Sequence, residues 1–333
     1  MQREKQAEAP QFEELVSKLD KQLTLDCLGG QGEAKERLRE LTEQLRYSSV
    51  FSHWDSSAPK GTLLVGPPGT GKTHAVRCLA NEVGCFLVEI RYEDIASMWV
   101  DRPIELLKDI KKKIEDKITE TGDKVIVFLD EAEVFMPTRD TYGLMMPDKK
   151  KTNFFLMWLD GGLRENKNIF FIAATNHEKS MDPAARRDGR FENRIAFEAL
   201  DIDGVIEVFQ IHIGISEGRL GRNIFGEIDW NDLRSDLVSL TGAEAAGVIK
   251  VAKRMKAREH REALEEKFQR CRDDAMSVVG EDLTLDMLVE GERDLVPDII
   301  STETMRAAIQ LFIDDKNKKD SSEKTVVRGF SSA

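Results

Sequence analysis

A glycine- and proline-rich stretch, Gly66-Pro-Pro-Gly-Thr-Gly-Lys-Thr73, separates a short apolar run from a helical pattern. It matches G-x-x-x-x-G-K-[ST], the pattern of a phosphate-binding loop. Glycines let backbone N–H groups converge on a phosphate without steric clash, and the N-terminus of the following helix adds partial positive charge. The stretch therefore predicts a strand, a phosphate-binding loop and a helix in that order, which is a building block of parallel α/β folds.

Apolar runs and helical patterns alternate through the first 200 residues. One run is nearly continuous in apolar residues, as expected of a strand that is buried on both faces. Five strands are predicted, at 62–66, 85–90, 125–131, 168–176 and 194–200. Helical patterns between them, such as the charged one at 103–119, favour an α/β fold with a doubly wound, five-stranded parallel sheet.

The strand signal stops near residue 201, and helical patterns dominate as far as residue 313. We expect a small helical domain there, followed by a polar tail without periodicity, which is typical of disorder. The first residues carry sparse apolar positions at roughly helical spacing and form either a short amphipathic helix or a frayed arm. The predicted domains are an arm at 1–24, a P-loop domain at 25–200, a helical domain at 201–313 and a disordered tail at 314–333.

The net charge is −12, which repels a phosphate backbone and argues against nucleic-acid binding over a broad surface. The net charge does not exclude a local basic channel, although the lysine runs at 111–113 and 149–151 are better interpreted as solvated faces. The four cysteines have neither zinc-site nor disulfide spacing and indicate a reducing compartment. No apolar run reaches membrane-spanning length and the N-terminus lacks an apolar signal-peptide core, so a cytoplasmic location is expected.

Polar side chains end the third and fourth predicted strands. Asp130 and Glu131 end the third strand, where a carboxylate can hold Mg²⁺ and its neighbour can activate water. With Lys72 for the phosphates and Thr73 for Mg²⁺, the acidic pair indicates nucleotide hydrolysis. Asn176 ends the fourth strand and either contacts the γ-phosphate or caps a turn.

The segment 181–193, MDPAARRDGRFEN, carries three arginines in a turn-rich stretch. A guanidinium suits the charge that develops during phosphoryl transfer. Taken alone, these arginines read better as members of surface salt bridges.

Four motifs together, GPPGTGKT, VIVFLDEAE, IAATN and DPAARRDGRFEN, resemble in order and spacing the AAA branch of the AAA+ ATPases. The resemblance extends over about residues 25–313. It implies ATP and Mg²⁺ as cofactors and a ring assembly, usually a hexamer, built from copies of this chain or from related chains. In that ring, arginine fingers act on the ATP that the neighbouring subunit binds.

The resemblance also assigns the site residues. Catalysis would fall to Lys72, Glu131, Asn176, Arg187 and Arg190. Metal binding would fall to Thr73 and Asp130. Nucleotide contacts would come from Cys27, Leu28 and Gly29, from Gly66, Pro67, Pro68, Gly69, Thr70, Gly71, Lys72, Thr73 and His74, and from Val208, His212, Gly242 and Ala243.

The family also has an aromatic-apolar-Gly triplet that faces a central pore and grips extended polypeptide. Trp99 and Val100 fit its first two positions, whereas Asp101 replaces the glycine. Without the resemblance, Trp99 reads better as a packed aromatic. Asp160-Gly161-Gly162 replaces the family's Asp-Gly-Phe signalling element, and the breaker-rich loop at 136–152 lacks the usual glycines.

Together with these residues, the resemblance implies a ring-forming Mg·ATP hydrolase that remodels, unfolds or disassembles a protein substrate through a pore, with an adaptor as a possible partner. Three alternatives remain. A non-threading regulatory switch would use ATP only for assembly. A nucleic-acid motor or loader conflicts with the net charge, and a small-molecule P-loop kinase fits the arginine pair and the helical domain less well.

Overall fold

The computed structural model describes residues 12–18, 23–56, 58–91, 103–138, 146–165, 168–187, 189–275 and 299–330. The chain divides into two compact units, Met1–Ala199 and Leu200–Ala333. Each unit is described by itself below.

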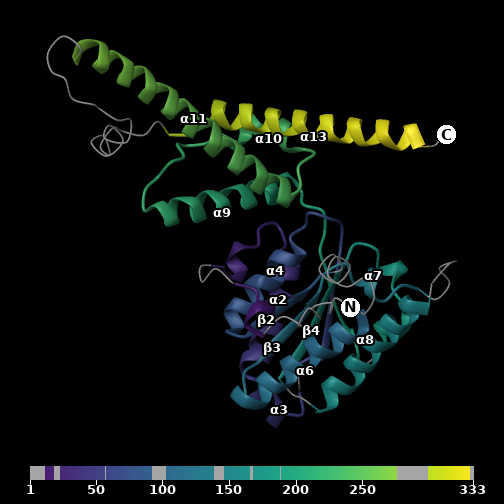
Figure 1. The fold of residues 1–333 in the computed structure, drawn as a ribbon. Helices are drawn as coiled ribbons and strands as arrows, with labels where there is room; N and C mark the ends of the chain where they lie inside the picture. Colours follow the sequence, from purple (N-terminus) through teal and green to yellow (C-terminus); the bar gives the residue numbers. More distant parts are fainter. Residues whose placement is uncertain are drawn as a thin grey trace, which may run out of the picture. The chain divides into compact units, whose positions relative to one another are not determined.

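The first unit is built on five parallel strands in the order β2-β3-β4-β1-β5 (Figure 1). Every residue of β3 and β4 is buried, which explains their unbroken apolar sequences. The strands are β1 (Gly61–Val65), β2 (Phe86–Ile90), β3 (Val125–Leu129), β4 (Ile169–Thr175) and β5 (Asn193–Ala196). This arrangement confirms the predicted five-stranded parallel sheet.

Helices cover both faces of this sheet (Figure 1). One face packs on α2 (Gly32–Arg46) and α4 (Lys72–Val83). The other packs on α6 (Pro103–Thr121), α7 (Ala132–Phe135) and α8 (Met146–Glu165). The doubly wound arrangement is therefore confirmed. The remaining helices of the unit are α1 (Phe12–Leu15), α3 (Ser48–His53) and the 3₁₀ turns Leu25–Cys27, Glu178–Ser180 and Pro183–Arg186.

The N-terminal arm contacts the exposed edge of the sheet. Phe12 is buried, and its ring meets Phe86 edge to face at 5.4 Å between centroids. Val16 forms an antiparallel bridge with Val88, and the Ser17 N–H donates to the carbonyl of Leu87 at 2.8 Å. The arm thus satisfies part of the hydrogen-bonding edge that β2 would otherwise present to solvent.

The loop predicted at 136–152 is shorter than expected. Helix α8 begins at Met146, and Pro147 lies in its first turn. Proline is tolerated there because the N–H groups of the first turn have no partner within the helix. Residues 139–145 lie outside the described residues.

The second unit consists of helices α9 (Ile202–Leu220), α10 (Trp230–Leu237), α11 (Gly242–Ala275) and α13 (Thr302–Phe330) among its described residues. Their apolar faces share one core around Phe209, Val248 and Ile309. Asp201 and Asp229 cap the N-termini of α9 and α10 by accepting backbone N–H groups.

Residues 314–330 continue helix α13, whereas the sequence predicted a disordered tail from residue 314. Low hydrophobicity suggested disorder. The segment nevertheless contains lysines, which are good helix formers, contains no proline, and directly follows a helix that is already nucleated by packing. Among the described parts of the chain, none of the helices has both the length and the apolar character that a membrane crossing requires.

Candidate nucleotide-binding site

The phosphate-binding loop connects the carboxyl end of β1 to the first turn of α4. Gly69 and Gly71 have φ values of 76° and 93°, which are strained for residues with a side chain. Gly71 is the N-cap of α4, and no side chain among the described residues caps that helix end. The backbone N–H groups of the first turn are therefore available to an anion such as a phosphate.

Lys72 lies inside this loop and is only 7% exposed. Its Nζ donates to the carbonyls of Gly66 (2.8 Å) and Pro67 (2.7 Å) and to Oδ1 of Asn176 (2.7 Å). Burial lowers the pKa of Lys72, while the carboxylates of Asp130 and Glu133 act in the opposite direction. The structure thus brings Lys72 and Asn176 together and leaves the ammonium group in an environment that favours an added negative charge.

Thr73 and Asp130 form the second contact of the site. Thr73 Oγ1 donates to Asp130 Oδ2 at 2.9 Å. A hydroxyl and a carboxylate oxygen are the donor types that Mg²⁺ prefers, so this pair fits the expected ion. No cluster of three or more potential metal ligands occurs among the described residues. Mg²⁺ commonly relies on one or two carboxylates together with substrate phosphates.

Glu131 directly follows Asp130 and has a φ of 55°, in the left-handed region. Its backbone N–H donates to Asp130 Oδ1 at 3.1 Å, and the residue is exposed. A non-glycine residue in this conformation costs about 1–3 kcal/mol and is concentrated at functional sites. The strand therefore ends at Leu129, two residues earlier than predicted, because the chain turns sharply at the acidic pair.

The entry segment Cys27–Gly29 adjoins the loop. A Cβ at Gly71 would lie 3.1 Å from Cδ1 of Leu28, which is buried. His74 Nε2 lies 3.2 Å from the carbonyl oxygen of Cys27. Burial lowers the pKa of His74, so its imidazole is neutral near pH 7.

Gln31 is a residue of this region that the sequence did not single out. It is 5% exposed, and its Nε2 donates to the carbonyls of Thr70 (3.4 Å) and Glu198 (2.8 Å). Its Oε1 accepts the N–H of Glu198 at 3.2 Å. Gln31 thus fastens the phosphate-binding loop to the segment after β5. Only a fold that brings residues 31, 70 and 198 together reveals this role.

The two candidate finger arginines lie elsewhere in the first unit. Arg190 makes a two-pronged ion pair with Asp160 of α8 (2.8 and 2.7 Å) and donates to the carbonyl of Ala184 at 2.6 Å. The Asp160 carboxylate raises the pKa of Arg190. Arg187 is exposed. Neither arginine bonds to the phosphate-binding loop.

The other predicted site residues fall into two groups. Trp99 and Val100 lie outside the described residues, within the span 92–102. The remaining ones belong to the second unit: Val208 and His212 lie in α9, and Gly242 and Ala243 open α11.

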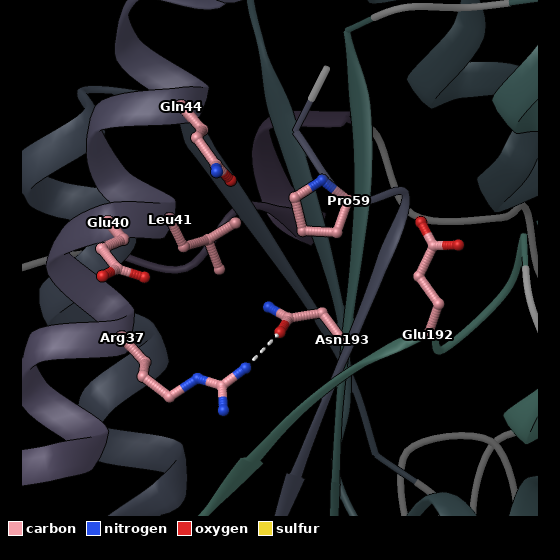
Figure 2. Close-up of a pocket in the computed structure, with 7 residues that line it drawn as sticks. All are labelled: Arg37, Glu40, Leu41, Gln44, Pro59, Glu192 and Asn193. Atoms are coloured by element: carbon pink, nitrogen blue, oxygen red, sulfur yellow. Dashed lines mark hydrogen bonds between the residues drawn. The ribbon is translucent and has the colours of Figure 1, made fainter. Parts of the chain in front are cut away.

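A separate pocket of about 350 Å³ lies beside α2, at the amino ends of β1 and β5 (Figure 2). It is lined by Arg37, Glu40, Leu41, Gln44, Pro59, Glu192 and Asn193. Arg37 Nη2 donates to Asn193 Oδ1 at 3.1 Å, as Figure 2 shows. Because the phosphate-binding loop follows the opposite end of β1, this pocket is not the nucleotide site.

A doubly wound parallel sheet with a phosphate-binding loop after β1 and an acidic pair after β3 defines a P-loop ATPase domain. Residues 62–199 match the family model of the ATPase family associated with various cellular activities (AAA). Residues 62–199 therefore form an AAA-family ATPase domain, and the activity of such a domain is ATP hydrolysis.

Several curated proteins are related to the chain. Protein SAV of Sulfolobus acidocaldarius is 32% identical over 229 residues, which cover 68% of this chain and 27% of that protein. The ATP-dependent zinc metalloprotease FtsH 3 of Symbiobacterium thermophilum is 30% identical over 252 residues, or 75% of this chain and 38% of the relative. The FtsH of Rhodothermus marinus is 32% identical over 76% of this chain and 35% of its own length. The chain thus spans well under half the length of these relatives.

Proposed function

We propose that this chain is a Mg·ATP hydrolase that works as a ring, a hexamer by analogy with the family, and draws a protein substrate through a central pore. The observation that supports a ring is the separation of the candidate finger arginines from the phosphate-binding loop of the same chain. A Cβ at Gly61, the first residue of β1, would lie 2.4 Å from the carbonyl oxygen of Arg190. The phosphate-binding loop begins at Gly66, after the other end of the same strand.

A strand of five residues spans about 16 Å, at roughly 3.3 Å per residue. An arginine side chain held to Asp160 at the amino end of β1 cannot also reach a phosphate at the carboxyl end. Arg187 and Arg190 are therefore proposed to act on the nucleotide of a neighbouring copy or of a related chain. Members of the AAA family are typically oligomeric, which agrees with this arrangement.

Within one site, each described residue has a proposed task. Lys72 exchanges its loop carbonyls for the β- and γ-phosphates, and the uncapped N-terminus of α4 binds phosphate oxygens. Thr73 and Asp130 would hold Mg²⁺, which supplies charge neutralisation at the phosphates when bound. Glu131 would orient and deprotonate the attacking water, and Asn176 would help to place that water.

The nucleotide-binding and lid roles of the second unit belong to the same proposal. Val208 and His212 would contact the adenine and ribose, and Gly242 and Ala243 would pack against the nucleotide through their backbone. Movement of this unit would report the nucleotide state as a rigid-body change. A reducing compartment such as the cytoplasm belongs to the same proposal and rests on the spacing of the four cysteines, which fits neither a zinc site nor a disulfide framework.

The shared site can be tested by mixing two inactive variants. Lys72→Ala disables the phosphate-binding loop, and Arg187→Ala combined with Arg190→Ala disables the fingers. If the fingers act in trans, mixed assemblies contain sites with an intact loop and intact fingers, and ATPase activity returns. If mixtures that form oligomers hydrolyse no more ATP than the separate variants, the trans arrangement is wrong.

The substrate class requires a second experiment. Unfolded protein should stimulate ATP hydrolysis, whereas DNA should not, because the chain carries a strong net negative charge. Trp99→Ala should abolish substrate unfolding with basal ATPase activity retained. Unfolding at the full rate by Trp99→Ala would instead favour the non-threading switch, and stimulation by DNA alone would favour the nucleic-acid motor.

A further inference from the structure

A cluster of three charged residues lies beside the nucleotide site and has no assigned role. Arg77 of α4 binds Glu89 of β2 through two hydrogen bonds, Nε to Oε1 at 2.7 Å and Nη2 to Oε2 at 2.9 Å. Arg91 donates from Nη2 to the same Oε2 at 2.7 Å. The Glu89 side chain is only 5% exposed, whereas those of Arg77 and Arg91 are 36% and 49% exposed.

The fold places this cluster close to the predicted metal ligand Asp130. Arg77 follows Thr73 by one helical turn, so the two side chains share a face of α4, and Thr73 is bonded to Asp130. Glu89 pairs in register with Phe128. Asp130 follows the end of β3, and its bond to Thr73 places its side chain on the side of the sheet that packs on α4.

Arg77 is therefore bonded to Glu89 and lies close enough to Asp130 for the charges of both carboxylates to raise the pKa of its guanidinium. A guanidinium bound to Asp130 would occupy the oxygens that a magnesium ion needs and would repel the ion. The structure shows Arg77 satisfied instead by the two oxygens of Glu89. Asp130 remains bonded to Thr73, the other proposed magnesium ligand.

We propose that Glu89 is a positioning residue that holds Arg77 away from Asp130 and so keeps this carboxylate available to Mg²⁺. The inference rests on the proposed magnesium role of Thr73 and Asp130. Arg91 supplies a second cation to Glu89, which compensates the burial of its charge. The two arginines keep the pKa of Glu89 at about 2 despite the opposing effect of burial, so the carboxylate is ionised throughout the neutral range.

The test is a magnesium titration of nucleotide binding, read from the fluorescence of a labelled ADP rather than from turnover. In Glu89→Gln the amide keeps the shape of the side chain but loses its charge, and Arg77 turns to Asp130. We expect the Mg²⁺ concentration at half-maximal binding to rise at least fivefold. In the double variant with Arg77→Met, the competing guanidinium is gone and the midpoint should return to within twofold of the wild-type value.

Arg91→Met is the matched control, because it removes a cation from the same carboxylate and leaves Arg77 held. Its midpoint should stay within twofold of the wild type. Thermal unfolding without Mg²⁺ checks that each variant folds. Should Glu89→Gln not fold, Glu89→Asp provides the test, because a shorter side chain loses the two-pronged geometry and should raise the midpoint two- to threefold.

An unchanged midpoint in the folded Glu89 variant, or a double variant as impaired as Glu89→Gln, would overturn the inference. If ADP binding by the wild type does not depend on Mg²⁺, the proposed magnesium role of Thr73 and Asp130 is itself wrong, which is a different result.

Discussion

Replacing Gly61 with alanine should impair ATP hydrolysis by the proposed ring without weakening nucleotide binding. The added Cβ would lie 2.4 Å from the carbonyl oxygen of Arg190 and 2.9 Å from its carbonyl carbon. Restoring an ordinary separation of about 3.5 Å requires a shift of roughly 1 Å. The atoms that must move are backbone, so no side-chain rotation can relieve the clash. The displaced segment carries Arg190 itself.

The size of the effect follows from this displacement. A misplacement of about 1 Å in a catalytic group can cost on the order of 100-fold in rate, or about 2.7 kcal/mol of activation free energy. Overpacking should also lower the free energy of unfolding by about 1–3 kcal/mol. ADP affinity should stay unchanged, because the phosphate-binding loop lies at the other end of β1 and is held by its own contacts.

The assay compares turnover at saturating protein concentration with the dissociation constant for ADP. Gly214→Ala is the control, since a Cβ at that position of α9 has nothing within 4 Å. A Gly61→Ala protein that folds and turns over within twofold of the wild type would refute the reasoning. So would a loss of turnover matched by an equal loss of ADP affinity, because the damage would then lie at the loop.

Four other changes test separate parts of the structure. Lys72→Met removes charge-assisted hydrogen bonds and should weaken ATP binding by about 10- to 100-fold in a direct binding assay. Asp160→Asn weakens the two-pronged contact of Arg190 and should lower turnover while ADP affinity stays constant. Phe12→Ala should lower the free energy of unfolding in urea by about 3 kcal/mol, because a buried aromatic at the sheet edge is lost. The pKa of Glu89 is lowered from 4.5 to about 2, so its ionised form stabilises the fold above about pH 4.5 and this contribution disappears as the pH falls toward 2. The free energy of unfolding of the wild type should therefore exceed that of Glu89→Gln by at most about 3 kcal/mol at pH 7. A difference between the two proteins that is the same at pH 7 and pH 2 would contradict this.

Local patterns were sufficient to predict the sheet, because apolar runs and breakers report the environment of each strand directly. The glycine loop, the run at 125–129 and the acidic pair after it occupy the positions that their spacing implied. The predicted end of the third strand was wrong by two residues, since a glutamate with positive φ gives no compositional signal. The tail beyond residue 313 misled for a related reason, because average polarity does not reveal a helix that continues from a packed one.

Contacts between segments that are distant in the chain could not be predicted from the sequence. Gln31 reads as an ordinary polar residue until the fold places it between Thr70 and Glu198. Asp160 was recognisable as part of a motif, but its bond to Arg190 depends on how α8 meets the segment before β5. Glu89 reads as a polar interruption in an apolar strand, and only the packing of α4 on β2 pairs it with Arg77.

If the finger arginines act in trans, the distance of one strand between Arg190 and the phosphate-binding loop determines how inactive copies affect active ones in a mixed population. Each chain would then contribute to two different sites. A copy without its finger arginines prevents hydrolysis at the neighbouring site, and a copy with a defective phosphate-binding loop leaves the arginines of its neighbour without a nucleotide to act on. A minority of inactive chains would then reduce the ATPase activity of intact partners out of proportion to their number. Dilution would abolish hydrolysis even by intact chains, because no single chain contains a complete site. The ATPase activity would therefore depend on the local concentration of the chain.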